Sequence, residues 1–220
     1  MIELQIISSI LLLLQKIFMI LKEDIISKSS FLKKLTSILP INAWAWIVGI
    51  FGIIALSACL YLQTIIENRS DLWIMVFSNS ASAPIMCYAL LVVLAKEGSS
   101  WKGFLEKWNI TFKIIMIILT ISVCIMLFIR AFTVDLDVLS VKQRVSLILQ
   151  LALSATSLLG TLFLAFNKRK SSMTGWGLYA VTHVMSATVM FMVGSPILGV
   201  CQIASIPFAY IGIMQQRERS

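Results

Sequence analysis

Residues 43–65 read AWAWIVGIFGIIALSACLYLQTI, an apolar run long enough to cross a membrane as one helix and free of charged side chains. Five more apolar runs without Asp or Glu follow it, and another near the N-terminus is interrupted by Gln15 and Lys16. With 59% hydrophobic residues and a mean hydropathy of +0.95, the chain is predicted to be an all-α, polytopic membrane helix bundle of about seven transmembrane helices. The runs are Leu4–Leu21, Ala43–Ile65, Leu72–Ala95, Ile110–Phe132, Val145–Phe166, Trp176–Val193 and Ile197–Gly212.

The basic residues are concentrated in alternate connections between the runs. Twelve Lys and Arg fall on one side of the predicted membrane and three on the other. Because basic loops stay on the cytoplasmic side, the C-terminus is predicted to be cytoplasmic. The run Leu4–Leu21 either crosses the bilayer, with Lys16 and Lys22 reaching toward one interface, or lies in the membrane plane. The basic side comprises 22–41, 96–108, 167–174 and the C-terminal tail.

Seven crossings divide into three, one and three helices. The chain is then a single transmembrane domain, residues 1–220, with a first triplet at about 4–95, a linker helix at about 110–132 and a second triplet at about 145–212. In this arrangement the two triplets run the same way and form parallel repeats. If the N-terminal run does not cross, the remaining triplets are antiparallel instead.

The sequence contains no recognisable catalytic motif. His183 is the only histidine, and all ten acidic residues lie outside the apolar runs. No His-based triad or metal cluster can be built from these residues, so we expect neither an enzyme, nor a metal site, nor a cofactor. Without intramembrane carboxylates, proton or cation coupling is not expected either. The net charge of +8 sits in the loops, which indicates the anionic lipid bilayer, not nucleic acid, as the partner.

Polar side chains at helical spacing mark a candidate binding site in the run Trp176–Val193. Four of them follow at steps of three, four and three, which places them on one helix face. Trp and Tyr stack on flat rings, while His and Ser exchange hydrogen bonds. The alternative is an aromatic belt with interhelical hydrogen bonds. Three amides in other runs are costly to bury and join the set. The candidate substrate-binding residues are Trp176, Tyr179, His183, Ser186, Asn79, Gln150 and Gln202.

The same spacing carries a family resemblance. Trp176 is followed by an aromatic residue three positions later and by a serine ten positions later. Further along are two glycines, Gly194 and Gly212, and then a basic tail. In this pattern the region from Val145 onward resembles the bacterial nicotinamide riboside transporters of the PnuC family, which share a three-one-three helix plan with the SWEET sugar facilitators. Two departures are clear: His183 replaces an Asn, and Cys201 replaces an acidic or amide position.

The resemblance implies a facilitator for a small, neutral, ring-bearing solute, such as nicotinamide riboside or a related vitamin or nucleoside. Transport would proceed by alternating access without ion coupling, in a bacterial inner (cytoplasmic) membrane. A separate cytoplasmic kinase would trap the substrate, and whether the chain forms homo-oligomers stays open. By the same implication, the aromatic residues of the set stack on the solute, and His183 and the three amides supply hydrogen bonds.

Two other hypotheses remain. One is a non-transporting integral membrane protein that acts as an assembly or immunity subunit, which would explain the departures from the family motifs. The other keeps the fold and changes the cargo to a sugar.

Overall fold

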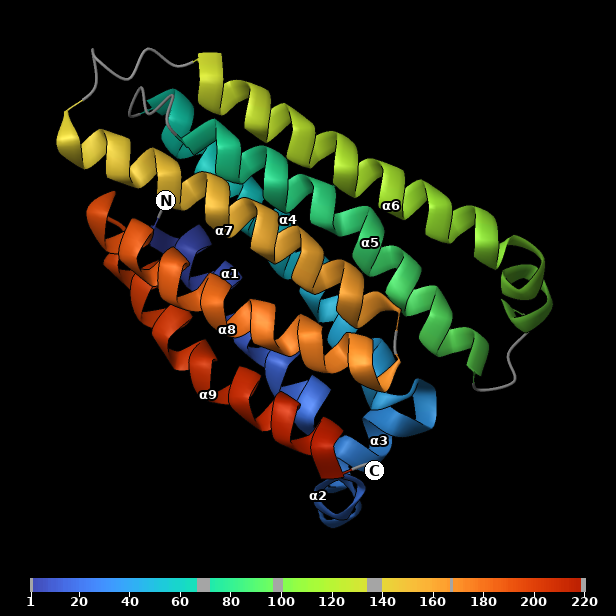
Figure 1. The fold of residues 1–220 in the computed structure, drawn as a ribbon. Coiled ribbons are helices and arrows are strands. Elements are labelled where there is room, and N and C mark those ends of the chain that lie inside the picture. Colours follow the sequence, from blue (N-terminus) through green and yellow to red (C-terminus); the bar gives the residue numbers. More distant parts are fainter. Residues whose placement is uncertain (1, 67–71, 97–100, 134–139, 167, 219–220) are drawn as a thin grey trace.

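The computed structural model describes residues 2–66, 72–96, 101–133, 140–166 and 168–218, and all secondary structure in these residues is helical. Successive long helices run in opposite directions, so the two chain ends lie at opposite ends of the bundle (Figure 1). The predicted connections at 67–71, 97–100 and 134–139 lie outside the described residues. The helices are α1 (Ile2–Ile20), α2 (Glu23–Lys28), α3 (Ser30–Ile38), α4 (Ile41–Ile66), α5 (Trp73–Lys96), α6 (Trp101–Thr133), α7 (Val141–Ala165), α8 (Arg169–Met192) and α9 (Pro196–Glu218).

Six of the long helices in the described part of the chain have the length and composition of membrane spans: α1, α4, α5, α6, α7 and α9. Even the shortest, with 19 residues, is about 29 Å long at 1.5 Å per residue, close to the thickness of a bilayer core. Helix α8, with 24 residues, is also long enough to cross a bilayer, but its polar side chains lower its hydropathy and it is not among these six. It packs along α7 and α9. The structure thus supports the predicted all-α, polytopic membrane fold.

The long helices other than α6 form a closed ring. Each packs against the next in the order α1, α4, α5, α7, α8, α9, and α9 packs back against α1. Helix α6 lies outside this ring against α5 and α7, and it is the least buried of the candidate spans (Figure 1). A ring gives each of its helices one face toward lipid and one face toward a shared interior.

Two predicted helix starts were wrong. Helix α6 begins at Trp101 instead of Ile110, and α8 begins at Arg169 instead of Trp176. Hydropathy marks only the part of a helix that matches the bilayer core. Adding a polar turn to an existing helix costs little, and Lys and Glu are good helix formers. Stretches read as basic loops are therefore partly the first turns of helices.

The polar stretch between α1 and α4 is also helical. Helix α2 and α3 occupy it, and Ser29 caps α3 by accepting a hydrogen bond from the Leu32 backbone N–H at 3.3 Å. The indole N–H of Trp44 donates to the Leu35 carbonyl at 3.0 Å and ties the end of α3 to the start of α4. Both short helices lie at the same end of the bundle as the C-terminus (Figure 1).

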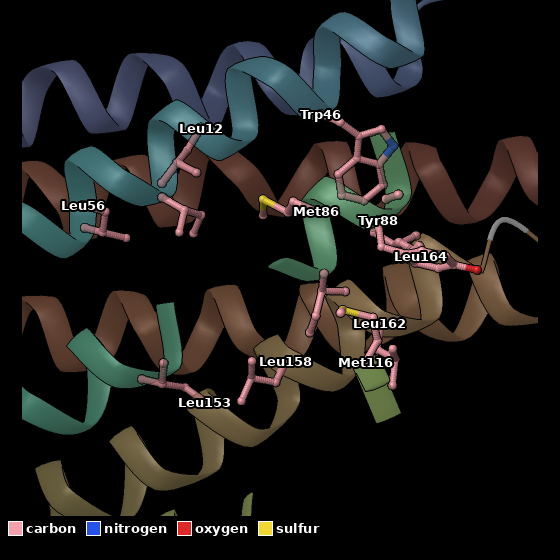
Figure 2. Close-up of a cluster of buried hydrophobic side chains, with 14 of the residues drawn as sticks. Leu12, Trp46, Leu56, Met86, Tyr88, Met116, Leu153, Leu158, Leu162 and Leu164 are labelled. Atoms are coloured by element: carbon pink, nitrogen blue, oxygen red, sulfur yellow. The ribbon is translucent and has the colours of Figure 1, made fainter. Parts of the chain in front are cut away.

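One apolar cluster joins the ring helices. Figure 2 shows part of it, including Leu12 of α1, Leu56 of α4, Met86 of α5, and Leu153 and Leu158 of α7. Lipid tails are as apolar as these side chains, so the cluster holds the helices together by close packing and not by removal of water.

Glycines allow the closest helix contacts. A Cβ at Gly212 of α9 would collide with the ring of Trp176 on α8, and one at Gly49 of α4 would collide with the amide of Gln15 on α1. Large or polar side chains thus lie directly on a neighbouring backbone, as is common between membrane helices.

We expect Gly212→Ala to lower the free energy of unfolding by about 1–3 kcal/mol, because the new methyl group forces Trp176 to move. Gly177→Ala on α8 is the matched control, since nothing lies within 4 Å of the added Cβ. Thermal unfolding of both variants in detergent checks this. Equal melting temperatures for the two variants would contradict the α8–α9 contact.

Candidate functional site

A small cavity of about 60 Å³ lies inside the ring. Each of the six ring helices contributes to its wall, so residues from both ends of the sequence meet there. The wall combines apolar side chains with amides, hydroxyls, one histidine and one lysine. Its lining residues are Leu12, Gln15, Lys16, Ile53, Leu56, Met75, Asn79, Met86, Leu153, Ser157, Thr161, Tyr179, Thr182, His183, Ser186, Met190 and Gln202.

One wall of the cavity is a pair of stacked rings on α8. The rings of Tyr179 and His183 have centroids 5.7 Å apart and planes 14° from parallel. The Tyr179 hydroxyl lies 2.8 Å from Oγ1 of Thr161, which itself donates to the Ser157 carbonyl at 2.8 Å. Because the Thr161 proton is used there, the Tyr179 hydroxyl is the donor between the two side chains. This bond fixes the tyrosine ring against α7.

His183 is held on one side only. Its Nδ1 lies 2.7 Å from the amide oxygen Oε1 of Gln202 on α9, so Nδ1–H is the donor. In the neutral ring Nε2 is then an acceptor, and this buried atom has no hydrogen-bond partner. A buried polar atom without a partner is costly, and a polar ligand group in the cavity would supply one.

Five of the seven candidate residues line this cavity: Asn79, Tyr179, His183, Ser186 and Gln202. They come from α5, α8 and α9, so the structure brings together residues that the sequence grouped only by residue type and helical spacing.

Trp176 and Gln150 do not line the cavity. Trp176 is buried against Gly212, beside the ring of Tyr179 at a centroid distance of 6.3 Å. Gln150 is fully buried one turn before Leu153 on α7, where its Nε2 donates to Oγ of Ser146 at 3.1 Å and its Oε1 has no partner.

Sequence reasoning missed the contribution of α1. If the N-terminal run crossed the bilayer, Lys16 was expected to reach toward an interface. That part of the prediction was wrong, because the residue is 7% exposed and lines the cavity. Gln15 lines the same cavity. The only sequence signal was that these two polar residues interrupt an apolar run, which does not show the direction in which they point.

Two further hollows lie toward the end of the bundle that carries α2 and the C-terminus. A cavity of about 80 Å³ is lined by Trp176, Trp46, Met19 and Asn42, among others. A groove of about 510 Å³ shares Met19 and Asn42 with it and is also lined by Lys22 and residues of α2. The contacting rings of Trp176 and Tyr179 lie between the central and the second cavity. The three hollows therefore follow one another from the surface to the centre.

The other end of the ring is closed by buried polar contacts. Gln63 of α4 donates to Oγ of Ser195 at 3.1 Å, and Gln5 of α1 donates to the same oxygen at 3.5 Å. Ser195 lies in the turn between α8 and α9, where Gly194 has φ of 79°. These bonds join the first long helices to the last ones across the bundle.

A separate hollow of about 330 Å³ lies between α5 and α6, lined by residues such as Phe77 and Met126. Its wall is apolar, which suits a lipid chain better than a polar solute. No cluster of three or more His, Cys, Asp or Glu side chains occurs in the described residues, so they offer no metal site.

No family model, no curated protein and no solved structure matches the chain. The resemblance to the PnuC family therefore stays a prediction from the sequence.

We expect Tyr179→Phe to lower the free energy of unfolding by about 1 kcal/mol, because it removes the hydrogen bond to Thr161. Tyr210→Phe is the control, since that side chain is 62% exposed on the outer face of α9. Thermal unfolding in detergent compares the two. A Tyr210→Phe variant as destabilised as Tyr179→Phe would show that the contact to α7 contributes nothing.

Proposed function

We propose that the protein is a membrane facilitator for a small ring-bearing solute and that the central cavity is its binding site in a closed state. The main support is the composition of the cavity wall, which combines stacked rings, hydroxyls and amides from five of the six ring helices around the unpartnered Nε2 of His183. A cavity of about 60 Å³ is far below the roughly 300 Å³ typical of ligand pockets, so solute binding requires the helices to separate.

We further propose that the helices move as two triplets, α1–α4–α5 and α7–α8–α9, joined by α6 in the three-one-three plan of the PnuC and SWEET families. Contacts between the triplets at both ends of the bundle support this. At one end are the Gln63 and Gln5 bonds to Ser195; at the other, Gln215 donates to the Ile20 carbonyl at 2.7 Å. In alternating access, breaking one set while keeping the other would open the cavity to one side at a time.

The charge of the cavity limits which solutes it can bind. Nicotinamide riboside was a wrong example of a neutral solute, because its pyridinium ring carries a fixed positive charge. A Lys16 ammonium in the same cavity would repel that charge. Among the solutes that the resemblance implies, we therefore propose a vitamin or nucleoside without a positive charge. A bacterial inner membrane and a separate cytoplasmic kinase that traps the solute remain part of this proposal.

Uptake into proteoliposomes tests the function, with a panel of nicotinamide, nicotinate, nicotinamide riboside, riboflavin, thiamine, ribose and glucose. We expect saturable uptake of at least one ring-bearing solute. His183→Ala should reduce uptake at low solute concentration by about 10-fold or more, because it removes both the stacked ring and the free acceptor. Val184→Ala, on the exposed face of the same helix, should not.

Other outcomes separate the alternatives. If folded protein takes up nothing from the panel, the facilitator proposal fails, and an assembly or immunity subunit becomes the leading hypothesis. Uptake of ribose or glucose alone would instead indicate a sugar facilitator.

A further inference from the structure

Lys16 is the one charged side chain among the residues that line the central cavity. It lies on the inner face of α1 and is 7% exposed. Its hydrogen bond runs to the Leu12 carbonyl in its own helix, at 3.4 Å, near the upper limit for such a bond. This carbonyl already serves the helix backbone, so it only weakly satisfies an ammonium group with three donors.

The described residues contain no carboxylate that could neutralise this ammonium group. No Asp or Glu is among the described residues that line the cavity. The acidic residues whose side chains the structure describes are all exposed, namely Glu3, Glu23, Asp24, Glu106 and Glu218. An ammonium group buried without a counter-charge is strongly unfavourable, and the described residues of the cavity wall do not provide the negative partner.

The neighbouring groups do not supply that partner. His183 is either neutral, with Nε2 as a dipolar acceptor, or protonated, which would place a second positive charge in the same cavity. Gln15, Asn79 and Gln202 line the cavity with amides, which carry no net charge. Cys201 of α9 interacts electrostatically with Lys16, but its thiol donates a hydrogen bond to the Ser9 carbonyl at 3.5 Å and is therefore neutral. Since none of these described groups is negatively charged, a full negative charge must come from a bound solute.

The stacked rings of Tyr179 and His183 form part of the same wall. Their faces suit a planar ring, and the ammonium group suits an oxygen anion. We propose that the solute is a planar aromatic or heteroaromatic carboxylate, with its ring against Tyr179 and His183 and its carboxylate against Lys16. This inference rests on the proposed function and names the class of solute for the same cavity.

Nicotinate and nicotinamide are a matched pair of probes, because they share one ring and differ in a carboxylate against a neutral carboxamide. Calorimetry on the purified protein in detergent should give a dissociation constant for nicotinate about 10-fold or more below that for nicotinamide, as expected for a charge-assisted hydrogen bond. Lys16→Met should bring the two constants together, and Lys16→Arg should keep them apart. Lys34→Met removes an exposed lysine of α3 and should leave the preference unchanged.

Lys16→Met should also be at least as stable to heat as the parent protein, because an apolar side chain of similar length replaces an unpaired buried charge. If Lys16→Met does not fold, Lys16→Gln serves as the second neutral variant, and the same loss of preference is expected.

The outcomes distinguish this inference from the function on which it rests. Equal binding of both probes to the parent protein, or a preference for nicotinate that survives in the neutral variant, would overturn the role of Lys16 and leave the facilitator proposal standing. A folded protein that binds neither probe and transports nothing from the solute panel would overturn both.

Discussion

The organisation of this bundle depends on one constraint: inside a bilayer, a polar side chain cannot find water and must find a partner within the protein. Lys16, Asn79, Gln150 and His183 come from four different helices and are all buried. A closed ring of six helices lets each helix turn such a face inward and an apolar face toward lipid. The six ring helices meet at the central cavity, which is lined by Lys16, Asn79 and His183 but not by Gln150.

The same constraint distinguishes buried polar groups that hold the helices together from buried polar groups that could bind a solute. The buried bond between Tyr179 and Thr161 satisfies both hydroxyl groups and holds α8 against α7. Nε2 of His183 and the ammonium group of Lys16 are not satisfied in this way. In a bundle with no ligand to bind, an apolar residue at either position would cost less folding free energy. Buried polar groups that lack a partner within the protein and face a shared cavity are what a binding site for a polar solute requires.

Much of the fold could be predicted from the sequence because hydropathy reports directly on the environment of each helix. The apolar runs correspond to helices, and even the interrupted run Leu4–Leu21 forms the long helix α1. The starts of α6 and α8 could not be found this way, since their first turns lie beyond the apolar segments. Spacing within one run grouped Tyr179, His183 and Ser186 correctly on one face of α8.

The partners of each face could not be predicted, because spacing within a helix does not reveal its neighbours. Trp176 shares a stripe with Tyr179, yet it packs against Gly212 and lines the second cavity. Lys16 follows a run of leucines, and a long flexible side chain can reach either an interface or an interior. Lys16 faces inward because of the position of α1 between α4 and α9, which the sequence does not show.

Accessibility of the ring interior to water tests this account most directly. In a variant with the four native cysteines replaced, Ser186→Cys and Val184→Cys place a thiol on opposite faces of α8, one 5% and the other 54% exposed. If the interior is the solute path, a membrane-impermeant thiol reagent should modify position 186 in membrane vesicles, and position 184, which faces lipid, should stay unmodified. An unreactive thiol at 186 together with a reactive one at 184 would contradict it.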